Sequence, residues 1–391
     1  MDARPFLKLD LDSIRTPVHI IDEVALTRNL RVLRSVQDRT GAKIILALKA
    51  FAQFSVFPLI RDYLPGSTAS SLNEARLAAE EFKGEVHLCA PAFPPEEVPK
   101  LVELADHIVF NSFYQRDLFW PAVQKANAHR SADPIQCGLR LNPEHRETEV
   151  ALYDPCAPGS RMGIRHADFI KGDLSGITGL HFHTLCEVGC PPLARTLEAV
   201  ERKFGRYIHQ MQWINWGGGH HISHPDYDVD GLCRLIDDFR NRYHHIQVYL
   251  EPGEAIAIRT GVLVSTVLDI INQTPPVVIL DTSATAHMPD VLEMPYRPEI
   301  YGAGEPGQFA HTYRLGGLTC LAGDVIGDYS FAEPLRRGDR LMFLDMSHYT
   351  MVKSSNFNGV RTPSIAIANS DTGSLRVVRE FGYEDFRNRL S

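Results

Sequence analysis

Lys49 ends a short apolar run, Lys43-Ile-Ile-Leu-Ala-Leu-Lys49, that is typical of a buried parallel strand. Burial lowers the pKa of an amine, and the neutral amine is the form that attacks an aldehyde. Such a lysine could therefore carry a Schiff base. The alternative is a lysine at a strand end whose long side chain extends to solvent, and Lys49 considered alone favours that alternative.

Two further patterns supply an anion site and an acid. The triplet Gly217-Gly218-Gly219 follows an apolar segment, and glycines leave backbone N–H groups bare to close around a phosphate. A simple tight turn is the alternative for this triplet. Glu251, which precedes Pro252, could keep a pyridine nitrogen protonated and so turn an aromatic ring into an electron sink. Taken alone, Glu251 could also be a helix cap or a surface acid.

The histidines allow two interpretations. His181 and His183 share a face if their segment is a strand, and such a pair is a familiar start to the metal site of a barrel hydrolase. The further metal-ligand candidates are His220, His221, His224 and Asp281. A metal site would need neither Lys49 nor the glycine triplet, whereas an aromatic cofactor would use His183 as a stacking plate. Together with Glu251, these residues indicate a pyridoxal 5′-phosphate site and no metal.

The elements that would position these residues alternate between strands and helices. We expect eight strands, over residues 43–49, 67–71, 85–90, 107–112, 135–142, 177–184, 212–219 and 247–253. Helical stretches separate most of them, including residues 72–82, 94–105, 193–204 and 229–243. This alternation predicts an α/β fold with a closed (β/α)8 TIM barrel. A doubly wound open sheet is the competing architecture, and the count of eight strands favours the barrel.

The barrel would bring the candidate residues together, because the active site of such a fold lies at the carboxyl ends of its strands. The expected strand ends carry Lys49, Asn142, His181 to His183, Gly217 to Gly219, and Glu251 to Glu254. The loops after the seventh and eighth strands are the usual phosphate site of these barrels. That position strengthens the phosphate interpretation of the glycine triplet.

A second domain is expected after about residue 260, since 391 residues exceed the usual size of a single core. The sequence there changes to short β-rich segments, at residues 261–267, 277–280, 340–344 and 363–367. We therefore expect a pyridoxal-phosphate-binding barrel over residues 20–260. A mostly β C-terminal domain would comprise residues 261–391 together with residues 1–19.

Composition excludes several classes of partner. There are 40 Lys and Arg against 48 Asp and Glu, a formal net charge of −8, with no basic block, which argues against nucleic acid. The amino terminus has charged residues where a signal peptide needs an apolar stretch, and no run could span a bilayer. Seven cysteines without a CxxC pair suit a reducing compartment. We expect a cytoplasmic protein with no membrane partner.

The sequence resembles a known family along nearly its whole length. The motifs that carry the resemblance are Ala47-Leu-Lys-Ala50, His181-Phe-His183, Trp216-Gly-Gly-Gly219, Leu250-Glu-Pro-Gly253, Leu318-Thr-Cys-Leu-Ala-Gly-Asp324 and Phe357-Asn-Gly359. They are similar to those of the pyridoxal-phosphate-dependent decarboxylases with the alanine racemase fold (fold type III). Within this family, residues 68–74 and 287–293 are most similar to the carboxynorspermidine (carboxyspermidine) decarboxylases of polyamine biosynthesis.

The resemblance implies roles for the residues that match the family's cofactor site. Lys49 would form the Schiff base, His183 would stack on the ring, and Glu251 would contact the pyridine nitrogen. Gly217 to Gly219 with Tyr349 would bind the phosphate.

The resemblance also gives the β domain a role in the reaction. Cys320 would reach into the barrel of a neighbouring subunit and donate the proton, and Asp324 would hold a substrate amine, which implies a homodimer with active sites at the interface. Without the resemblance, Cys320 would be read as a buried core cysteine. Ornithine and diaminopimelate decarboxylases carry arginine at the position of Glu254, and an acid there fits a polycationic substrate better. We also expect Asp281 to take part in substrate binding.

These expectations combine into the decarboxylation of carboxynorspermidine to norspermidine, of carboxyspermidine to spermidine, or of both. The alternatives are an ornithine, lysine or diaminopimelate decarboxylase of the same fold, a racemase, a non-catalytic pyridoxal-phosphate carrier and the metal-dependent hydrolase. A racemase benefits from a weaker electron sink than Glu251 would create, and the carriers lack a β domain. One methylene in a pocket is worth about 1–3 kcal/mol, so the sequence leaves the choice between the two polyamine substrates open.

Overall fold

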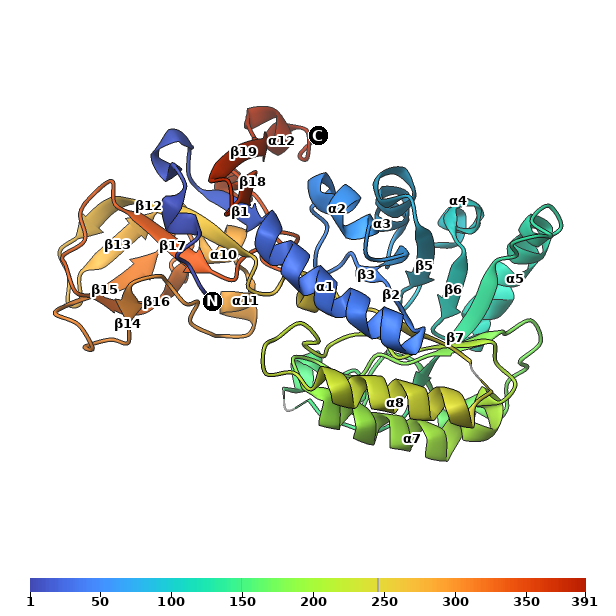
Figure 1. The fold of residues 1–391 in the computed structure, drawn as a ribbon. Helices are drawn as coiled ribbons and strands as arrows, with labels where there is room; N and C mark the ends of the chain where they lie inside the picture. The colour runs from blue at the N-terminus through green and yellow to red at the C-terminus, as the bar shows by residue number, and fades with distance from the viewer. Residues whose placement is uncertain (149, 245) are drawn as a thin grey trace. The chain divides into compact units, whose positions relative to one another are not determined.

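The computed structural model describes residues 1–148, 150–244 and 246–391. The chain folds into two compact units (Figure 1). One, the β unit, consists of residues 1–28 and 257–391, and the other, the barrel unit, consists of residues 29–256. Each unit has its own sheet.

The barrel unit is built on a parallel sheet that closes on itself. Its strands are β2 (Lys43–Ile44), β3 (Leu46–Ala47), β4 (Gly66–Ala69), β5 (Glu85–Cys89), β6 (His107–Phe110), β7 (Gln136–Asn142), β9 (Gly179–His181), β10 (Trp213–Asn215) and β11 (Gln247–Leu250), with β8 (Ile164–Arg165) beside β7. Their order is β2-β11-β10-β9-β7-β6-β5-β4-β3, and each pairing is parallel. The two ends of this path meet, because β2 and β3 are halves of the predicted strand 43–49, separated only by Ile45. The predicted (β/α)8 barrel is confirmed.

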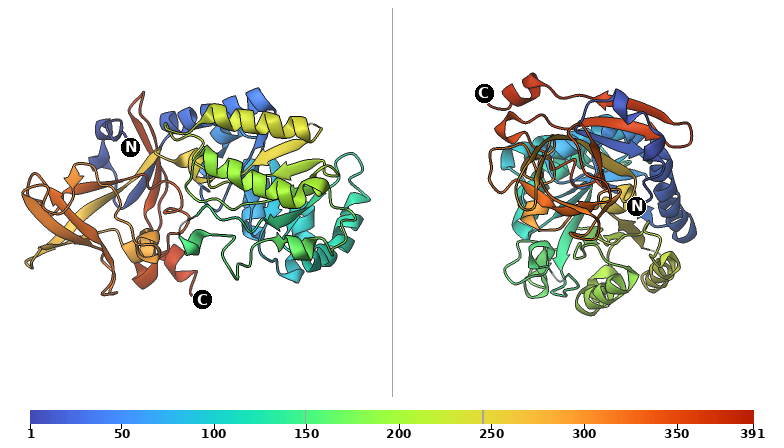
Figure 2. Two further views of the ribbon diagram at one scale, coloured as in Figure 1. Left: turned by 90° about the horizontal axis from the view of Figure 1, so that it is seen from below. Right: turned by 90° about the vertical axis from the view of Figure 1, so that its left-hand side faces the viewer.

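Helices connect the barrel strands. The main ones are α1 (Glu23–Thr40), α2 (Phe57–Arg61), α3 (Leu72–Leu77), α4 (Val98–Leu104), α5 (Phe113–Asn127), α6 (His166–Phe169), α7 (Cys190–Ile208), α8 (Val229–Arg242) and α9 (Glu254–Ala257). The side chains of Ser71, Ser112 and Asp228 cap α3, α5 and α8 by accepting backbone N–H groups. Helices α7 and α8 lie side by side on the outside of the barrel (Figures 1 and 2).

The strands nearest the candidate residues are shorter than predicted. Strands β3, β9, β10 and β11 end at Ala47, His181, Asn215 and Leu250. Gly217 and Gly219 have φ values of +69° and +86°, which an extended strand does not allow, so the chain turns there. Lys49, His183 and the glycine triplet therefore lie in turns just beyond the strands, where side chains and N–H groups are not used by the sheet.

The β unit is a mixed sheet. Its strands are β1 (Val18–Asp22), β12 (Gly261–Ile271), β13 (Val277–Leu280), β14 (Ala303–Gly304), β15 (His311–Gly316), β16 (Val325–Phe331), β17 (Arg340–Leu344), β18 (Ser364–Asn369) and β19 (Ser374–Arg379). Their order is β14-β16-β15-β13-β12-β1-β18-β19, and β17 pairs with β12. Strand β1, blue in Figure 1, lies between β12 and β18. Residues 18–22 thus belong to this sheet, although the expected domain boundary was residue 20. Short helices α10 (Ala284–His287), α11 (Asp290–Glu293) and α12 (Tyr383–Arg387) complete the unit.

Strands β14, β15, β16 and β19 of the β unit are absent from the sequence-based expectation, and the pair β15 and β16 shows why. They pair antiparallel with each other, and Arg314 and Asp328 form a bidentate ion pair across them on the exposed side. Tyr313, Leu315 and Tyr329 are buried in the core of the unit. A strand with one solvated face has no continuous apolar run, which is the pattern that marked the other strands.

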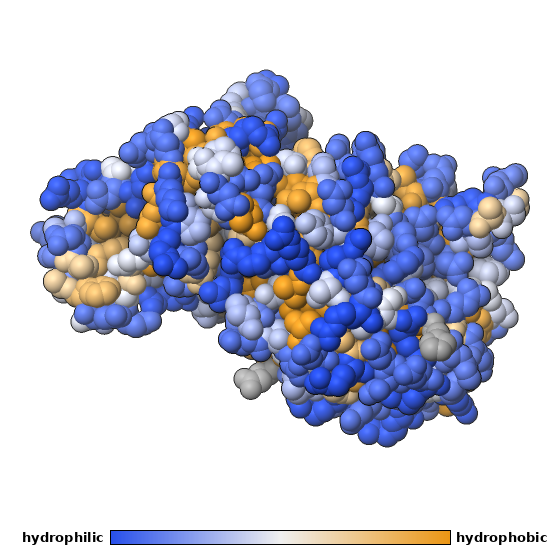
Figure 3. Space-filling model, in the orientation of Figure 1, coloured by the Kyte–Doolittle hydropathy of each residue, from blue (hydrophilic) through white to orange (hydrophobic). Residues whose placement is uncertain are grey.

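The surface and the cysteines add two observations. No helix within the described part of the chain is long and apolar enough to cross a membrane. The face shown in Figure 3 is mostly hydrophilic, with apolar residues in small separate areas. All seven cysteines are free thiols.

Candidate active site

Lys49 and His183 meet just beyond the carboxyl ends of the barrel strands. The Nζ atom of Lys49 lies 3.3 Å from Nε2 of His183. The backbone N–H of Gly218 donates to Nδ1 of His183 at 2.9 Å, so the proton of a neutral imidazole must be on Nε2. An Nε2–H group can donate to Lys49 only if Lys49 is a neutral amine with a free lone pair. The hydrogen bonds therefore favour a neutral lysine.

Electrostatics favour the same neutral pair. Burial lowers the pKa of His183 well below its ordinary value, and the positive charge of Arg140 adds to this effect. Burial also lowers the pKa of Lys49, Arg140 lowers it further, and Glu251 opposes the shift. Many protein atoms lie around the Lys49 side chain and displace water from it. Part of its surface still contacts solvent. An accessible neutral amine is what Schiff-base formation requires.

Arg140, on β7, is a site residue that sequence reasoning missed. Its side chain is 6% exposed. Its guanidinium donates to the backbone carbonyl of His183 at 3.0 Å and lies 3.4 Å from the sulfur of Met162. The signal that could have identified it is a cation inside an otherwise largely apolar strand. Arg140 places a permanent positive charge beside Lys49.

Replacing Arg140 with methionine is expected to raise the pKa of Lys49, because the charge of Arg140 is the largest cause of the lowering after burial. A higher pKa leaves less neutral amine at neutral pH, so linkage of Lys49 to pyridoxal phosphate moves to higher pH. The rate of linkage, followed by absorbance across pH in the cofactor-free protein, measures this shift. Arg206, exposed on α7, supplies the control variant Arg206→Met. An identical pH profile for Arg140→Met and wild type would contradict this explanation.

Glu251 follows β11 and is 8% exposed. Its Oε1 accepts a hydrogen bond from the Asn215 amide at 2.8 Å, and its Oε2 accepts one from Nε2 of His181 at 3.1 Å. Burial favours a higher pKa for Glu251, but His181, with smaller contributions from His87 and Asn215, outweighs burial and lowers the pKa to about 2. The result is a buried, ionised carboxylate held by donors from β10, which pairs with β11, and from β9, the next strand along.

The glycine triplet approaches other backbone too closely for side chains. A Cβ atom on Gly218 would lie 2.2 Å from the carbonyl oxygen of Glu251, and one on Gly219 would lie 1.9 Å from that of Leu185. The N–H of Glu251 donates to the carbonyl of Gly217 at 2.7 Å. These contacts fix the turn after β10 against the segment after β11. Only glycines allow this close approach.

Replacing Gly218 with alanine is expected to displace the backbone of Glu251, because the added Cβ overlaps its carbonyl. Overpacking of this kind costs about 1–3 kcal/mol of unfolding free energy, and pyridoxal phosphate should bind more weakly. Chemical denaturation and a cofactor titration measure the two effects. Gly382→Ala is the matched control, since nothing lies within 4 Å of a Cβ there. Equal stability and affinity in the two variants would show that the close approach is unimportant.

These residues fit pyridoxal phosphate. The cofactor's aldehyde needs a neutral amine, its ring nitrogen an ionised carboxylate, and its phosphate bare N–H groups. Lys49 and Glu251 provide the first two groups within the barrel unit. In the glycine triplet, the N–H groups of Gly217 and Gly218 already donate to Asn215 and His183, so Gly219 is the member whose N–H can meet the phosphate. Hydrogen bonds on both ring nitrogens fix the orientation of His183. Its stacking on the cofactor stays a prediction.

Asp324 and Cys320, two predicted site residues, lie in one loop of the β unit. Asp324 accepts hydrogen bonds from the hydroxyls of Ser283 and Thr319, at 2.8 and 2.7 Å, and from two backbone N–H groups. These four bonds use about all the acceptor sites of a carboxylate. Cys320 is exposed, and its N–H donates to the side chain of Asn358 at 2.7 Å. Asp324 therefore fastens the loop that carries Cys320, while substrate contact by either residue stays a prediction.

Asp281 and Tyr349 also lie in the β unit. The carboxylate of Asp281 accepts hydrogen bonds from the hydroxyl of Ser265 at 2.7 Å, the N–H of Thr266 at 2.8 Å and the hydroxyl of Thr16 at 2.5 Å. Tyr349 is half-buried after β17. The structure gives Asp281 a clear structural role, and the substrate and phosphate roles expected for these two residues stay predictions.

The histidines considered as metal ligands have other contacts. Their partners are Glu251 for His181, Lys49 and Gly218 for His183, Tyr227 for His220, Glu254 for His221 and Asp226 for His224. Within the described ranges, the group of three possible ligands that lie within reach of one another is Glu85, His87 and His107. It includes none of these histidines.

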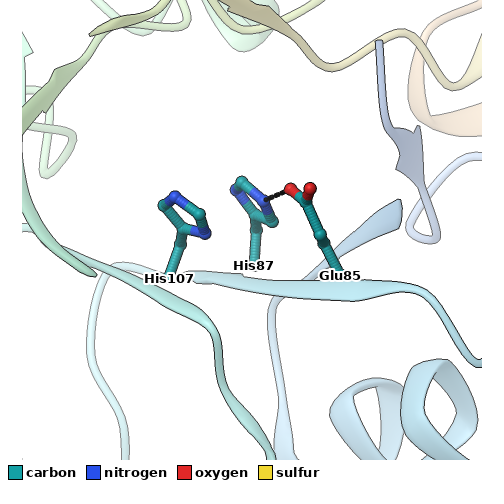
Figure 4. Close-up of side chains that lie close together, drawn as sticks. All are labelled: Glu85, His87 and His107. Carbon is teal, nitrogen blue, oxygen red and sulfur yellow. Dashed lines mark hydrogen bonds and ion pairs between the residues drawn. The ribbon is translucent and has the colours of Figure 1, made fainter. Parts of the chain in front are cut away.

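That group lies on β5 and β6 (Figure 4). Glu85 and His107 are the first residues of their strands, and His87 is the third residue of β5. The rings of His87 and His107 stack with centroids 4.0 Å apart and planes 10° apart. Lone pairs of two parallel rings lie in separate planes and do not point at one ion. Glu85 is already paired with the ammonium of Lys43 at 2.5 Å. These side chains form a polar layer on β5 and β6 inside the barrel. They do not support the metal-hydrolase alternative.

Comparison with known proteins gives one consistent family. A family model described as "Pyridoxal-dependent decarboxylase, C-terminal sheet domain" matches residues 151–347. A curated relative from Synechocystis sp., named carboxyaminopropylagmatine decarboxylase, is 46% identical over 97% of this chain and 96% of its own length. A relative from Campylobacter jejuni, named carboxynorspermidine/carboxyspermidine decarboxylase, is 42% identical over 97% and 99%.

A solved structure agrees with these relatives. The crystal structure of carboxynorspermidine decarboxylase from Campylobacter jejuni, complexed with norspermidine, matches 96% of this chain and 100% of its own with a TM-score of 0.87 and 42% identity. The fold and the cofactor expected from the sequence are confirmed. The chain belongs to the pyridoxal-phosphate-dependent decarboxylases with the alanine racemase fold.

Proposed function

We propose that the protein decarboxylates carboxynorspermidine to norspermidine and carboxyspermidine to spermidine, as a step in polyamine biosynthesis. The observation that carries this proposal is the 42% identity, over 97% of the chain, to a decarboxylase named for both substrates. The similar crystal structure contains norspermidine, the product of the first reaction. Carboxyaminopropylagmatine is a second candidate, because the 46% identical relative is named for it.

The barrel residues suit the bond-breaking step. When bound, pyridoxal phosphate supplies a ring that takes up the electron pair left as the carboxylate departs as carbon dioxide. Lys49, as a neutral amine, would hold the cofactor through its aldehyde, and His183 orients Lys49 through its Nε2–H group. Arg140 keeps the pKa of Lys49 low. Glu251 would hold a proton at the ring nitrogen, because an ionised carboxylate stabilises a neighbouring cation.

A proton must then replace the carboxylate on the same carbon. We assign its delivery to Cys320 of a neighbouring protomer, which is exposed on the loop fastened by Asp324 and Asn358. This role requires a homodimer, and we propose a cytoplasmic location for it because all seven cysteines are free. Sedimentation equilibrium should give a dimer. A fully active monomer would overturn both the dimer and the role of Cys320.

The test of the function is carbon dioxide release by the holoenzyme from six compounds. They are carboxynorspermidine, carboxyspermidine, carboxyaminopropylagmatine, ornithine, lysine and diaminopimelate. Release is expected from the carboxylated polyamines and not from the last three. The ratio of kcat/KM for carboxyaminopropylagmatine to that for carboxynorspermidine decides between the two candidates. Release from ornithine, lysine or diaminopimelate alone would contradict the proposal.

A further inference from the structure

His181, the first histidine of the motif His181-Phe-His183, contacts the buried acid of the site. It is the last residue of β9 and is 1% exposed. Its Nε2 atom lies 3.1 Å from Oε2 of Glu251. Its Nδ1 atom is buried and forms no hydrogen bond within the part of the chain that the structure describes. The polar contact of this ring thus leads to Glu251.

The proton of His181 lies on Nε2, because a bare Nε2 lone pair would face an ionised carboxylate. A doubly protonated ring would bury a second N–H at Nδ1 without an acceptor among the described residues, which is unfavourable. Burial also lowers the pKa of His181; Glu251 opposes this shift, and the charges of Arg140 and Lys49 add to it. His181 is therefore a neutral imidazole at neutral pH that donates to Glu251.

Asn215 donates to the other oxygen of Glu251. Its side chain is fully buried, its Oδ1 accepts the N–H of Gly217 at 2.8 Å, and its amide nitrogen donates to Oε1 of Glu251 at 2.8 Å. A backbone N–H can only donate, so Gly217 fixes which way the Asn215 amide points. Each carboxylate oxygen thus faces an N–H group, and a proton added to either oxygen would meet a donor. The arrangement favours the ionised form of Glu251 and opposes the effect of burial.

Other titratable groups near Glu251 have weaker or indirect effects on its charge. His87 lowers the pKa of Glu251 less than His181 does. The pKa of Lys49 is itself raised by Glu251, although burial outweighs this effect. Burial raises the pKa of the Cys89 thiol to about 11, so this neighbour is uncharged. His181 is the group that combines direct contact with the largest effect that opposes burial.

We propose that His181 is a positioning residue of the reaction, which donates its Nε2–H to Glu251 and so keeps this carboxylate charged at the ring nitrogen of the cofactor. The inference rests on the contact between Glu251 and the ring nitrogen in the proposed function. His181 acts through Glu251 and needs no contact with substrate or cofactor. Without this donor, burial becomes the main influence on Glu251, and the carboxyl takes up a proton at a higher pH.

The first test is an infrared pH titration of the cofactor-free protein. His181→Phe keeps a ring and removes the donor, whereas His181→Gln keeps an N–H group. For each protein, subtracting the spectrum of its Glu251→Gln version isolates the signal of Glu251. A protonated Glu251 carboxyl should be present at about pH 5 in His181→Phe and absent from wild type and His181→Gln. The control is His107→Phe, another buried histidine, whose ring stacks on His87, and it should match wild type.

The second test is kcat of the holoenzyme with carboxynorspermidine. The loss of kcat in His181→Phe should be about fivefold greater at pH 6 than at pH 9, where Glu251 is ionised again, and His181→Gln should stay within about threefold of wild type at both. Should His181→Phe not fold, as judged by circular dichroism, His181→Leu carries both tests.

Two kinds of result separate this inference from the function on which it rests. A Glu251 titration that is the same in wild type and His181→Phe, or a kcat loss in His181→Phe that is equal at pH 6 and pH 9, would overturn the role of His181. A Glu251→Gln holoenzyme with the kcat of wild type would instead overturn the contact of Glu251 with the ring nitrogen.

Discussion

Replacing Lys49 with alanine is expected to abolish covalent linkage of pyridoxal phosphate and to lower kcat by a factor on the order of 10³ or more. The expected size follows from the loss of a positioned reacting amine, a type of group worth roughly 10²–10⁴ in rate. Lys49 is the amine that His183 contacts, and burial and Arg140 keep its pKa low. The visible absorbance of the protein and carbon dioxide release from carboxynorspermidine measure the two effects.

The control for this variant is Lys100→Ala, an exposed lysine of α4 that pairs with Glu103. It should keep both absorbance and turnover. Because Lys49 is accessible and its loss leaves only a small gap at the strand ends, Lys49→Ala should fold normally. A Lys49→Ala protein that keeps its linkage to the cofactor would show that another lysine forms the Schiff base.

Replacing Glu251 with glutamine is expected to lower kcat about 10²–10³-fold, the usual cost of removing a preorganised charged contact in an active site. The amide keeps the shape of the side chain but no longer holds a proton on the ring nitrogen. The pKa of Glu251 is lowered to about 2, so its carboxylate stays ionised well below the pH at which an ordinary carboxyl is protonated. The loss of kcat should therefore be the same from about pH 6 to pH 9.

A matched control is Glu201→Gln on α7, where Glu201 pairs with Arg242 on the outer surface. It should leave kcat unchanged. The Glu251→Gln variant should bind pyridoxal phosphate, because the glycine triplet and Lys49 remain. A kcat within threefold of wild type would show that the ring nitrogen does not depend on this carboxylate.

Much of the barrel and of the cofactor site could be predicted from the sequence. Parallel strands buried on both faces appear as apolar runs, and their alternation with helices predicts the barrel. The residues that follow such runs then lie together at one end, which is why Lys49, Glu251 and the glycine triplet could be grouped without a structure. The chain reversal at Gly217 and Gly219 explains why the strands end earlier than the apolar pattern does.

Other features depend on contacts that no local pattern shows. The support of Glu251 by His181 and Asn215 joins three strands, and the influence of Arg140 on Lys49 joins two that are distant in sequence. From their residue type, Asp281 and Asp324 were expected to bind a cationic substrate. In the structure, their carboxylates accept hydrogen bonds from hydroxyl and N–H groups inside the β unit.

Strands β15 and β16 could not be recognised from the sequence for a related reason. Their burial depends on tertiary packing of a single face, which includes Tyr313 and Leu315, while the other face carries charges. Both the missed strands and the missed site contacts thus arise from packing between segments that are far apart in the chain.

The most direct test of the central claim is reduction of the yellow holoenzyme with borohydride, followed by peptide mapping to locate the modified lysine. Loss of the visible band and a pyridoxyl group on Lys49 are the results expected from its contact with His183 and its lowered pKa. A modified lysine elsewhere, or a colourless protein that contains zinc, would contradict this account of the site.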